Sequence, residues 1–162
     1  MRALIPLLAL LASPAVAQPA EPPCANVRAA LPSELAGWSQ QTPVSAGVKA
    51  GEGATLEVGH AALVSLHPAK HLAFKADGAA DANGGTLALA VTKPGTYRVA
   101  LGDTASIDLV EGGKAVAIAA HAAGPRCTGV KRLVDFTLKP GNYTVQLSGS
   151  AADTLALLVV RV

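Results

Sequence analysis

The stretch that decides the fold class is Lys139-Pro140-Gly141-Asn142-Tyr143-Thr144-Val145-Gln146-Leu147. Nearly the same pattern stands 46 residues earlier, as Lys93-Pro94-Gly95-Thr96-Tyr97-Arg98-Val99-Ala100-Leu101. In each copy the proline presets φ for a turn, and we expect the following glycine to take the positive φ of a type II turn. Alternate residues of the strand that follows then face an apolar core: Tyr97, Val99 and Leu101 in one copy, Tyr143, Val145 and Leu147 in the other.

The chain after Gln40 alternates short apolar runs with clusters of Gly, Pro, Asp and Asn, which is typical of sandwiches and barrels. The last run, 154–161, is apolar on both faces, which predicts a central or otherwise covered strand. We therefore predict a single all-β, jelly-roll-like β-sandwich of about eight to ten strands. The expected strands are 54–59, 61–67, 71–76, 86–92, 96–101, 105–110, 115–120, 130–138, 142–148 and 154–161.

One short helical segment is expected, at residues 26–38. Pro32 interrupts it, so Ser33 is expected to cap a second turn that Gly37 ends. Trp38, the only tryptophan, is expected to plug one end of the core, and a ligand platform is the alternative.

The first 17 residues have the pattern of an export signal: a positive start, an apolar run and the small-residue cleavage site Ala15-Val16-Ala17. We predict cleavage after Ala17, a Pro-rich tether at 18–23 and a β-sandwich domain at 24–162. No later segment is long and apolar enough to span a membrane. The expected location is therefore the periplasm or the medium.

Two cysteines, Cys24 and Cys127, remain after cleavage. In an exported protein such a pair predicts one disulfide, with two free thiols as the alternative. The bridge would close a loop of about 100 residues, for which chain entropy gives ~4–5 kcal/mol. We expect it to clamp the N-terminal segment onto the domain.

The charges are nearly balanced, with 13 basic and 11 acidic residues, and only 3% of residues are aromatic. Nucleic-acid binding therefore lacks both a basic surface and stacking platforms. No Gly-x-Ser-x-Gly motif or Cys-x-x-Cys pair is present, and the acidic residues are sparse. We therefore favour a protein that is not an enzyme.

The alternative is a metal-dependent enzyme that uses the histidines. His67 and His71 lie four positions apart, and Glu57 and His60 stand just before them. Two or more imidazoles with one carboxylate are a common ligand set for divalent transition metals. The candidate metal ligands are Glu57, His60, His67, His71 and His121.

Residues 86–161, with their Pro-Gly turns, tyrosines and alternating strands, resemble small secreted bacterial β-sandwiches of the pre-peptidase C-terminal type. That resemblance implies a jelly-roll-like fold and an accessory or binding role. The run from His121 through Cys127 to Phe136 resembles short exported alphaproteobacterial proteins labelled homogentisate 1,2-dioxygenase. The cupin iron motif of that dioxygenase family has no counterpart in this sequence.

The function we expect is thus that of an exported binding or structural protein of the bacterial envelope. Its expected ligands are a glycan, another envelope protein or a metal ion held by the histidines. An envelope-assembly role would require a contiguous exposed apolar patch. The first surface to test is the outward face of the paired strands, with Arg98, Thr144 and Gln146.

Overall fold

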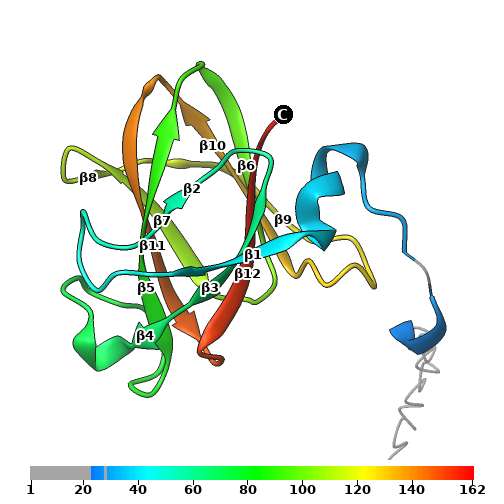
Figure 1. Cartoon of the computed structure of the whole chain (residues 1–162), viewed down its shortest axis with the longest axis horizontal. Coiled ribbons are helices and arrows are strands. Elements are labelled where there is room, and N and C mark those ends of the chain that lie inside the picture. The colour runs from blue at the N-terminus through cyan, green and yellow to red at the C-terminus, as the bar shows by residue number, and fades with distance from the viewer. Residues whose placement is uncertain (1–22, 28) are drawn as a thin grey trace, which may run out of the picture.

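Two six-stranded sheets pack face to face as a β-sandwich, which confirms the predicted fold class (Figure 1). The computed structural model describes residues 23–27 and 29–162, so the expected signal peptide and most of the tether lie outside the described residues. Among the described residues, no helix is long and apolar enough to cross a membrane.

The first sheet has the strand order β1-β3-β12-β6-β10-β9. Its strands are β1 (Gln41–Ser45), β3 (Ala61–Ser65), β12 (Thr154–Arg161), β6 (Gly95–Leu101), β10 (Arg132–Leu138) and β9 (Ile118–Ala123). All of its pairs are antiparallel except β1 with β3.

The second sheet has the order β2-β5-β11-β7-β8, and β4 also pairs with β5. Its strands are β2 (Thr55–Leu56), β5 (Asn83–Val91), β11 (Gly141–Ser150), β7 (Ser106–Glu111), β8 (Lys114–Ala115) and β4 (His67–Pro68). The chain changes sheet at most connections, so most neighbouring strands are distant in sequence. The jelly-roll connectivity stays a prediction.

The N-terminal segment forms two short 3-10 helices, η1 (Cys24–Asn26) and η2 (Ser33–Ser39), in place of the helix expected over 26–38. Pro32 is the N-cap residue of η2 and has an extended ψ of 146°, which separates the two turns. Ser33 is therefore the first helical residue and does not cap the turn. Gly37 lies inside η2 and does not end it.

The prediction of a strand at 71–76 is wrong. A third 3-10 helix, η3 (Ala69–His71), stands there, followed by an irregular segment that connects β4 to β5 within the second sheet. Leu72 and Phe74 alternate because they are half-buried beneath this connection, not because they belong to a sheet. Strand β1 is not among the expected strands. It contains Pro43, which an edge strand tolerates because it needs only one side of its ladder.

The two Pro-Gly-x-Tyr stretches supply β6 and β11, and each strand lies inside a different sheet. All six predicted inward residues of the two strands belong to the buried core between the sheets. Strand β12 also meets its prediction. Leu157 and Val159 face that core, whereas Leu158 and Val160 lie in a second buried cluster on the outer side of the sheet.

The prediction of type II turns at Gly95 and Gly141 is wrong. Gly95 has φ 152°, far from the +80° or so that such a turn needs, and Gly141 is not among the glycines with positive φ. At both positions the end of a flexible side chain from another strand lies close, so a larger residue would displace that side chain. A Cβ on Gly95 would stand 2.9 Å from Arg161 Nε, and one on Gly141 would stand 2.6 Å from Glu111 Oε1.

The two tyrosines fasten their turns by hydrogen bonds from the hydroxyl back to the residue four positions earlier. The Tyr97 hydroxyl donates to the carbonyl of Lys93 at 2.8 Å. The Tyr143 hydroxyl donates to the carbonyl of Lys139 at 2.9 Å and also accepts from the Lys139 amide at 3.2 Å.

We predict that Tyr143→Phe destabilises the protein more than Tyr97→Phe. Both changes keep the buried ring, but the first loses two hydrogen bonds and the second loses one. With about 1 kcal/mol per bond, the expected losses are about 2 and about 1 kcal/mol. Urea denaturation of the two variants measures the difference. Equal losses would show that the bond from the Lys139 amide does not contribute.

Candidate functional site

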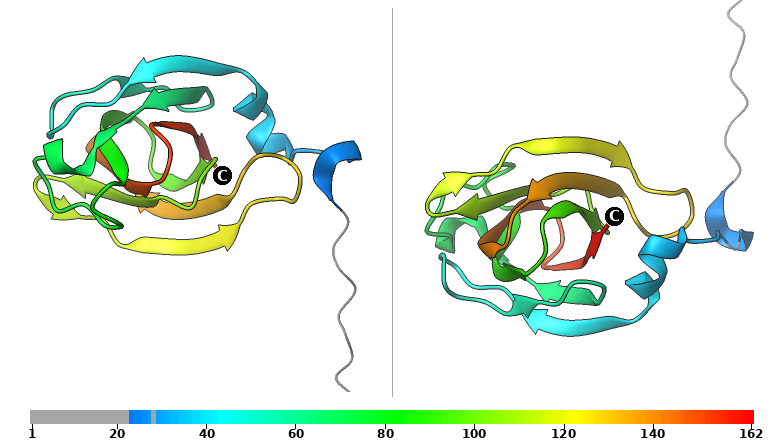
Figure 2. Two further views of the ribbon diagram at one scale, coloured as in Figure 1. Left: turned by 90° about the horizontal axis from the view of Figure 1, so that it is seen from below. Right: turned by 90° about the horizontal axis from the view of Figure 1, so that it is seen from above.

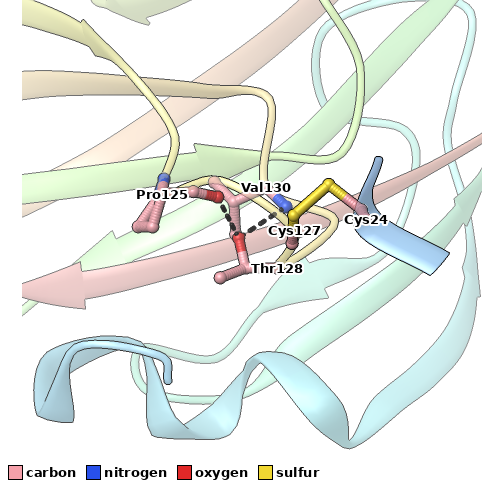
Figure 3. The surroundings of a disulfide bond; sticks show 5 residues. All are labelled: Cys24, Pro125, Cys127, Thr128 and Val130. Carbon is pink, nitrogen blue, oxygen red and sulfur yellow. Dashed lines mark hydrogen bonds between the residues drawn. A yellow bond between two sulfur atoms is a disulfide. The ribbon is translucent and has the colours of Figure 1, made fainter. Parts of the chain in front are cut away.

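The disulfide Cys24–Cys127 forms as predicted, with the two Cα atoms 5.2 Å apart (Figure 3). Cys127 has φ 61°, the only positive φ of a non-glycine residue in the described chain. Thr128 stabilises this turn, because its hydroxyl donates to the Pro125 carbonyl at 2.7 Å and accepts from the Val130 amide at 3.2 Å. The connection between β9 and β10 is thus a firmly held loop joined to η1.

Helix η2 lies on the outer face of the first sheet. Leu35 and Trp38 pack there against residues of β3, β6 and β12 and against the disulfide loop, in the cluster Leu35, Trp38, Ala61, Ala100, Val130, Leu158 and Val160. Trp38 Nε1 donates to the Thr128 carbonyl at 3.1 Å. The sequence predicted that Trp38 plugs one end of the main core. Instead, Trp38 lies in the separate cluster on the outer face of the first sheet. It fixes η2 to the disulfide loop.

A groove of about 520 Å³ opens beside Trp38, where four connections meet. They are the end of η2, the β6–β7 turn, the disulfide loop and the β11–β12 turn. The lining residues are Trp38, Gln41, Gly102, Asp103, Thr128, Gly129, Ala151, Ala152, Thr154, Leu155 and Ala156. This volume lies within the range of small-molecule binding sites, roughly 300–1,000 Å³.

Asp103 is the only charged residue in the lining of this groove. Its Oδ1 accepts the Thr104 amide at 2.6 Å, and its Oδ2 accepts the hydroxyl of Ser150, a fully buried residue, at 2.9 Å. Oδ1 also accepts the Thr104 hydroxyl at 3.4 Å. A carboxylate has about four acceptor sites, two on each oxygen, so Oδ2 is the oxygen that keeps capacity for a further donor. The groove thus presents a carboxylate in a fixed orientation.

The other polar groups around the groove are the side chains of Gln41, Thr128 and Thr154. The Thr128 hydroxyl is bonded within its own loop, and Gln41 Nε2 donates to the Trp38 carbonyl at 3.3 Å. The Gln41 oxygen, the second N–H of its amide and the Thr154 hydroxyl remain for the hydroxyl or amide groups of a ligand. The lack of a cation in the lining disfavours an anion. Gly102 and Gly129 lie beside the indole, since a Cβ on either would make an ordinary van der Waals contact with a Trp38 ring atom, at 3.6 Å.

Neither the family models nor the curated proteins contain a match to this sequence. The two family resemblances of the sequence therefore stay predictions, and the chemistry of the site is argued from its geometry alone.

The candidate metal ligands are spread over the fold. Glu57 and His60 form a pair, with Oε2 and Nδ1 3.6 Å apart, but both side chains are at least three-quarters exposed. His67 is half-buried, and its Nε2 donates to the Ala46 carbonyl at 2.9 Å. His71 is exposed in η3, and His121 is exposed on β9, at the other end of the first sheet from β1 and β3.

Within residues 23–27 and 29–162, no three His, Cys, Asp or Glu side chains form a group that could hold a metal ion. The structure thus brings together only one pair of the five candidates, Glu57 and His60.

The sequence predicted one outward surface with Arg98, Thr144 and Gln146, but these residues do not share a surface. Arg98 lies on the first sheet, and the other two lie on the second. The Arg98 guanidinium makes two 2.8 Å hydrogen bonds to Asp135 and stands 3.6 Å from Glu34 of η2. The hydrogen bond with Asp135, followed by the nearby negative charges, raises the pKa of Arg98 despite partial burial. Arg98 is therefore engaged in fastening η2 and is not free for a ligand.

The envelope-assembly role required a contiguous apolar patch. The large hydrophobic residues that the described chain exposes belong to five separate segments: Val27, Val58, Leu63, Ile118 and Val162. This distribution gives that role no support.

Sequence reasoning missed the groove, apart from its attention to Trp38. Asp103 stood among turn residues with no motif around it. The sequence offered one signal for the groove. Polar or glycine residues follow both the only tryptophan and the bridged Cys127: Gln41 in the first case, Thr128 and Gly129 in the second.

Proposed function

We propose that this protein is an exported, non-enzymatic binding module of the bacterial envelope that holds a short glycan segment in the groove beside Trp38. The observation that carries the proposal is the oriented Asp103 carboxylate at the end of an open groove of about 520 Å³. The hydroxyl groups of a sugar can donate hydrogen bonds to such a carboxylate. The disulfide supports export, because such bonds persist in oxidising compartments.

The groove has the character of a binding site more than that of a catalytic one. Its single carboxylate has no second acid in the lining, whereas most glycoside hydrolases use a pair. Trp38 is 5% exposed, so it offers no stacking face to a sugar ring. Affinity would then come from hydrogen bonds, and we expect weak binding, with a Kd of about 0.1–1 mM, or about −4 to −5.5 kcal/mol.

The test uses the single tryptophan as its reporter. Cellotriose, chitotriose and its deacetylated form are titrated into the mature protein, and Trp38 fluorescence is followed. We expect a saturable change with at least one of them. We expect Asp103→Ala to weaken that binding roughly tenfold to a hundredfold, which corresponds to the loss of a charge-assisted hydrogen bond.

Asp108→Ala is the matched control, because Asp108 is exposed on β7 and does not line the groove. It removes the same charge and should leave the affinity unchanged. The proposal fails if none of the three sugars gives a saturable signal, or if the two variants weaken binding equally.

A further inference from the structure

Among the described strands, β9 is the one long outer strand that contains no proline, lysine or other permanently charged residue, and its only irregularity is a bulge near its start. At the opposite edge of the first sheet, β1 contains Pro43. At the edges of the second sheet, β2 and β8 have two residues each, one of them Lys114, and β4 has two residues including Pro68. Short strands, proline and lysine are the usual means by which proteins block sheet edges.

None of these features occurs in β9. All six of its residues, Ile118 to Ala123, are exposed, and none is proline, lysine or another residue with a permanent charge. Figure 2 shows β9 in yellow and β1 in cyan on opposite outer sides of the molecule. Among the described residues, β9 pairs on one side only, with β10.

The backbone groups that β9 leaves unpaired can be assigned from the register. Ala123 is opposite Arg132, and one step further the Gly124 amide donates to the Lys131 carbonyl at 3.1 Å. Bonded and non-bonded pairs alternate in an antiparallel ladder. Gly124 and Ala122 therefore bond toward β10, whereas His121 and Ala123 direct their N–H and C=O groups to the open side.

The open segment is bounded symmetrically. Ala119 has no partner on β10 and forms a bulge between Ile118 and Ala120. On the other side, Pro125 has no N–H to continue a ladder. Both interruptions stand three positions from Ala122, so the segment between them is centred on that residue.

We propose that two copies of this protein pair through β9, antiparallel, about a two-fold axis at Ala122. Each His121 then lies opposite Ala123 of the other copy, and four backbone hydrogen bonds join the two first sheets. Ala122 meets its own counterpart at a non-bonded position, where Cα atoms approach to about 4.5 Å. An alanine fits that separation.

A second copy is the occupant that the charges and the other edges favour. The paired stretches are uncharged when His121 is neutral, so no like charges oppose one another, and the formal net charge of the chain is only +2. The other described stretches with a free side, β1 and residues 106–108 of β7, contain Pro43 and the charged Asp108. A two-fold pair uses the β9 edge of both copies. Pairing therefore closes as a dimer and does not extend into a filament.

The test is sedimentation velocity of the disulfide-bonded mature protein from about 1 µM to about 500 µM, a range suited to a small interface. We expect a concentration-dependent shift from monomer to dimer and no larger species. Ala122→Lys places two lysines face to face and should weaken the dimer about tenfold or more. Ala123→Pro removes an outward N–H while it spares the ladder to β10, and should weaken the dimer similarly.

Ala90→Lys is the matched control, since Ala90 is an exposed alanine of β5 in the other sheet. It should dimerise like the unchanged protein. Circular dichroism checks that each variant is folded. A protein that stays monomeric throughout would overturn the proposal and leave the edge to a different partner. Larger oligomers, or dimers that tolerate both β9 changes, would overturn it equally.

Discussion

Replacing Cys24 and Cys127 together by serine is expected to lower the free energy of unfolding by about 4–5 kcal/mol. The bridge joins residues 103 positions apart, so the reduced unfolded chain gains the entropy of nearly the whole domain. Native domains of this size are stable by only about 5–15 kcal/mol, so the loss is a large share of the total.

Urea denaturation at equilibrium, with Trp38 fluorescence and circular dichroism as probes, measures this change. Oxidised protein treated with a reductant provides the control, because it tests the same bond without a substitution. A loss below about 1 kcal/mol in both experiments would contradict the entropic account and would mean that the unfolded chain stays compact without the bridge.

The inner faces of the strands could be predicted from the sequence because they depend on a local period of two residues. Tyr97, Val99 and Leu101 alternate in the sequence and alternate in the sheet. The turn before them could not be predicted in the same way. Pro-Gly is compatible with several turns, and here the turn contacts Arg161, which lies 66 residues further along and donates a hydrogen bond to the Pro94 carbonyl at 3.0 Å.

The predictions of a helix at 26–38 and of a strand at 71–76 were wrong for a related reason. Short apolar patterns such as Leu72 and Phe74 report burial, and burial under a connection resembles burial in a sheet. Only the tertiary arrangement separates the two, because a strand needs a neighbour with free backbone groups.

The groove was out of reach of sequence reasoning because four distant connections build it. Asp103 meets Ser150 across 47 positions, and Trp38 meets Thr128 across 90. The histidines show the converse. His67 and His71 are close in sequence, yet no third ligand joins either of them in the described part of the chain, since Glu57, His60 and His121 lie on other segments.

Trp38→Ala is expected to lower the free energy of unfolding by about 3–5 kcal/mol. Its indole is 5% exposed and covers the outer face of β12 and β6, where Ala100 and Leu158 are fully buried. Truncation would open a cavity over these strands and leave the Thr128 carbonyl without its donor. Circular dichroism follows the urea transition, because this variant has no tryptophan to report it.

Trp38→Phe separates the two contributions. It keeps an aromatic ring in the cluster and loses the hydrogen bond, so the expected loss is smaller, about 1–2 kcal/mol. If Trp38→Ala lowers stability by less than about 1 kcal/mol, η2 is not part of the cooperative unit. The disulfide and Trp38 hold the same segment against the same loop. We therefore expect the triple variant to lose less than the sum of the two separate losses, because the second change removes an attachment that the first has already loosened.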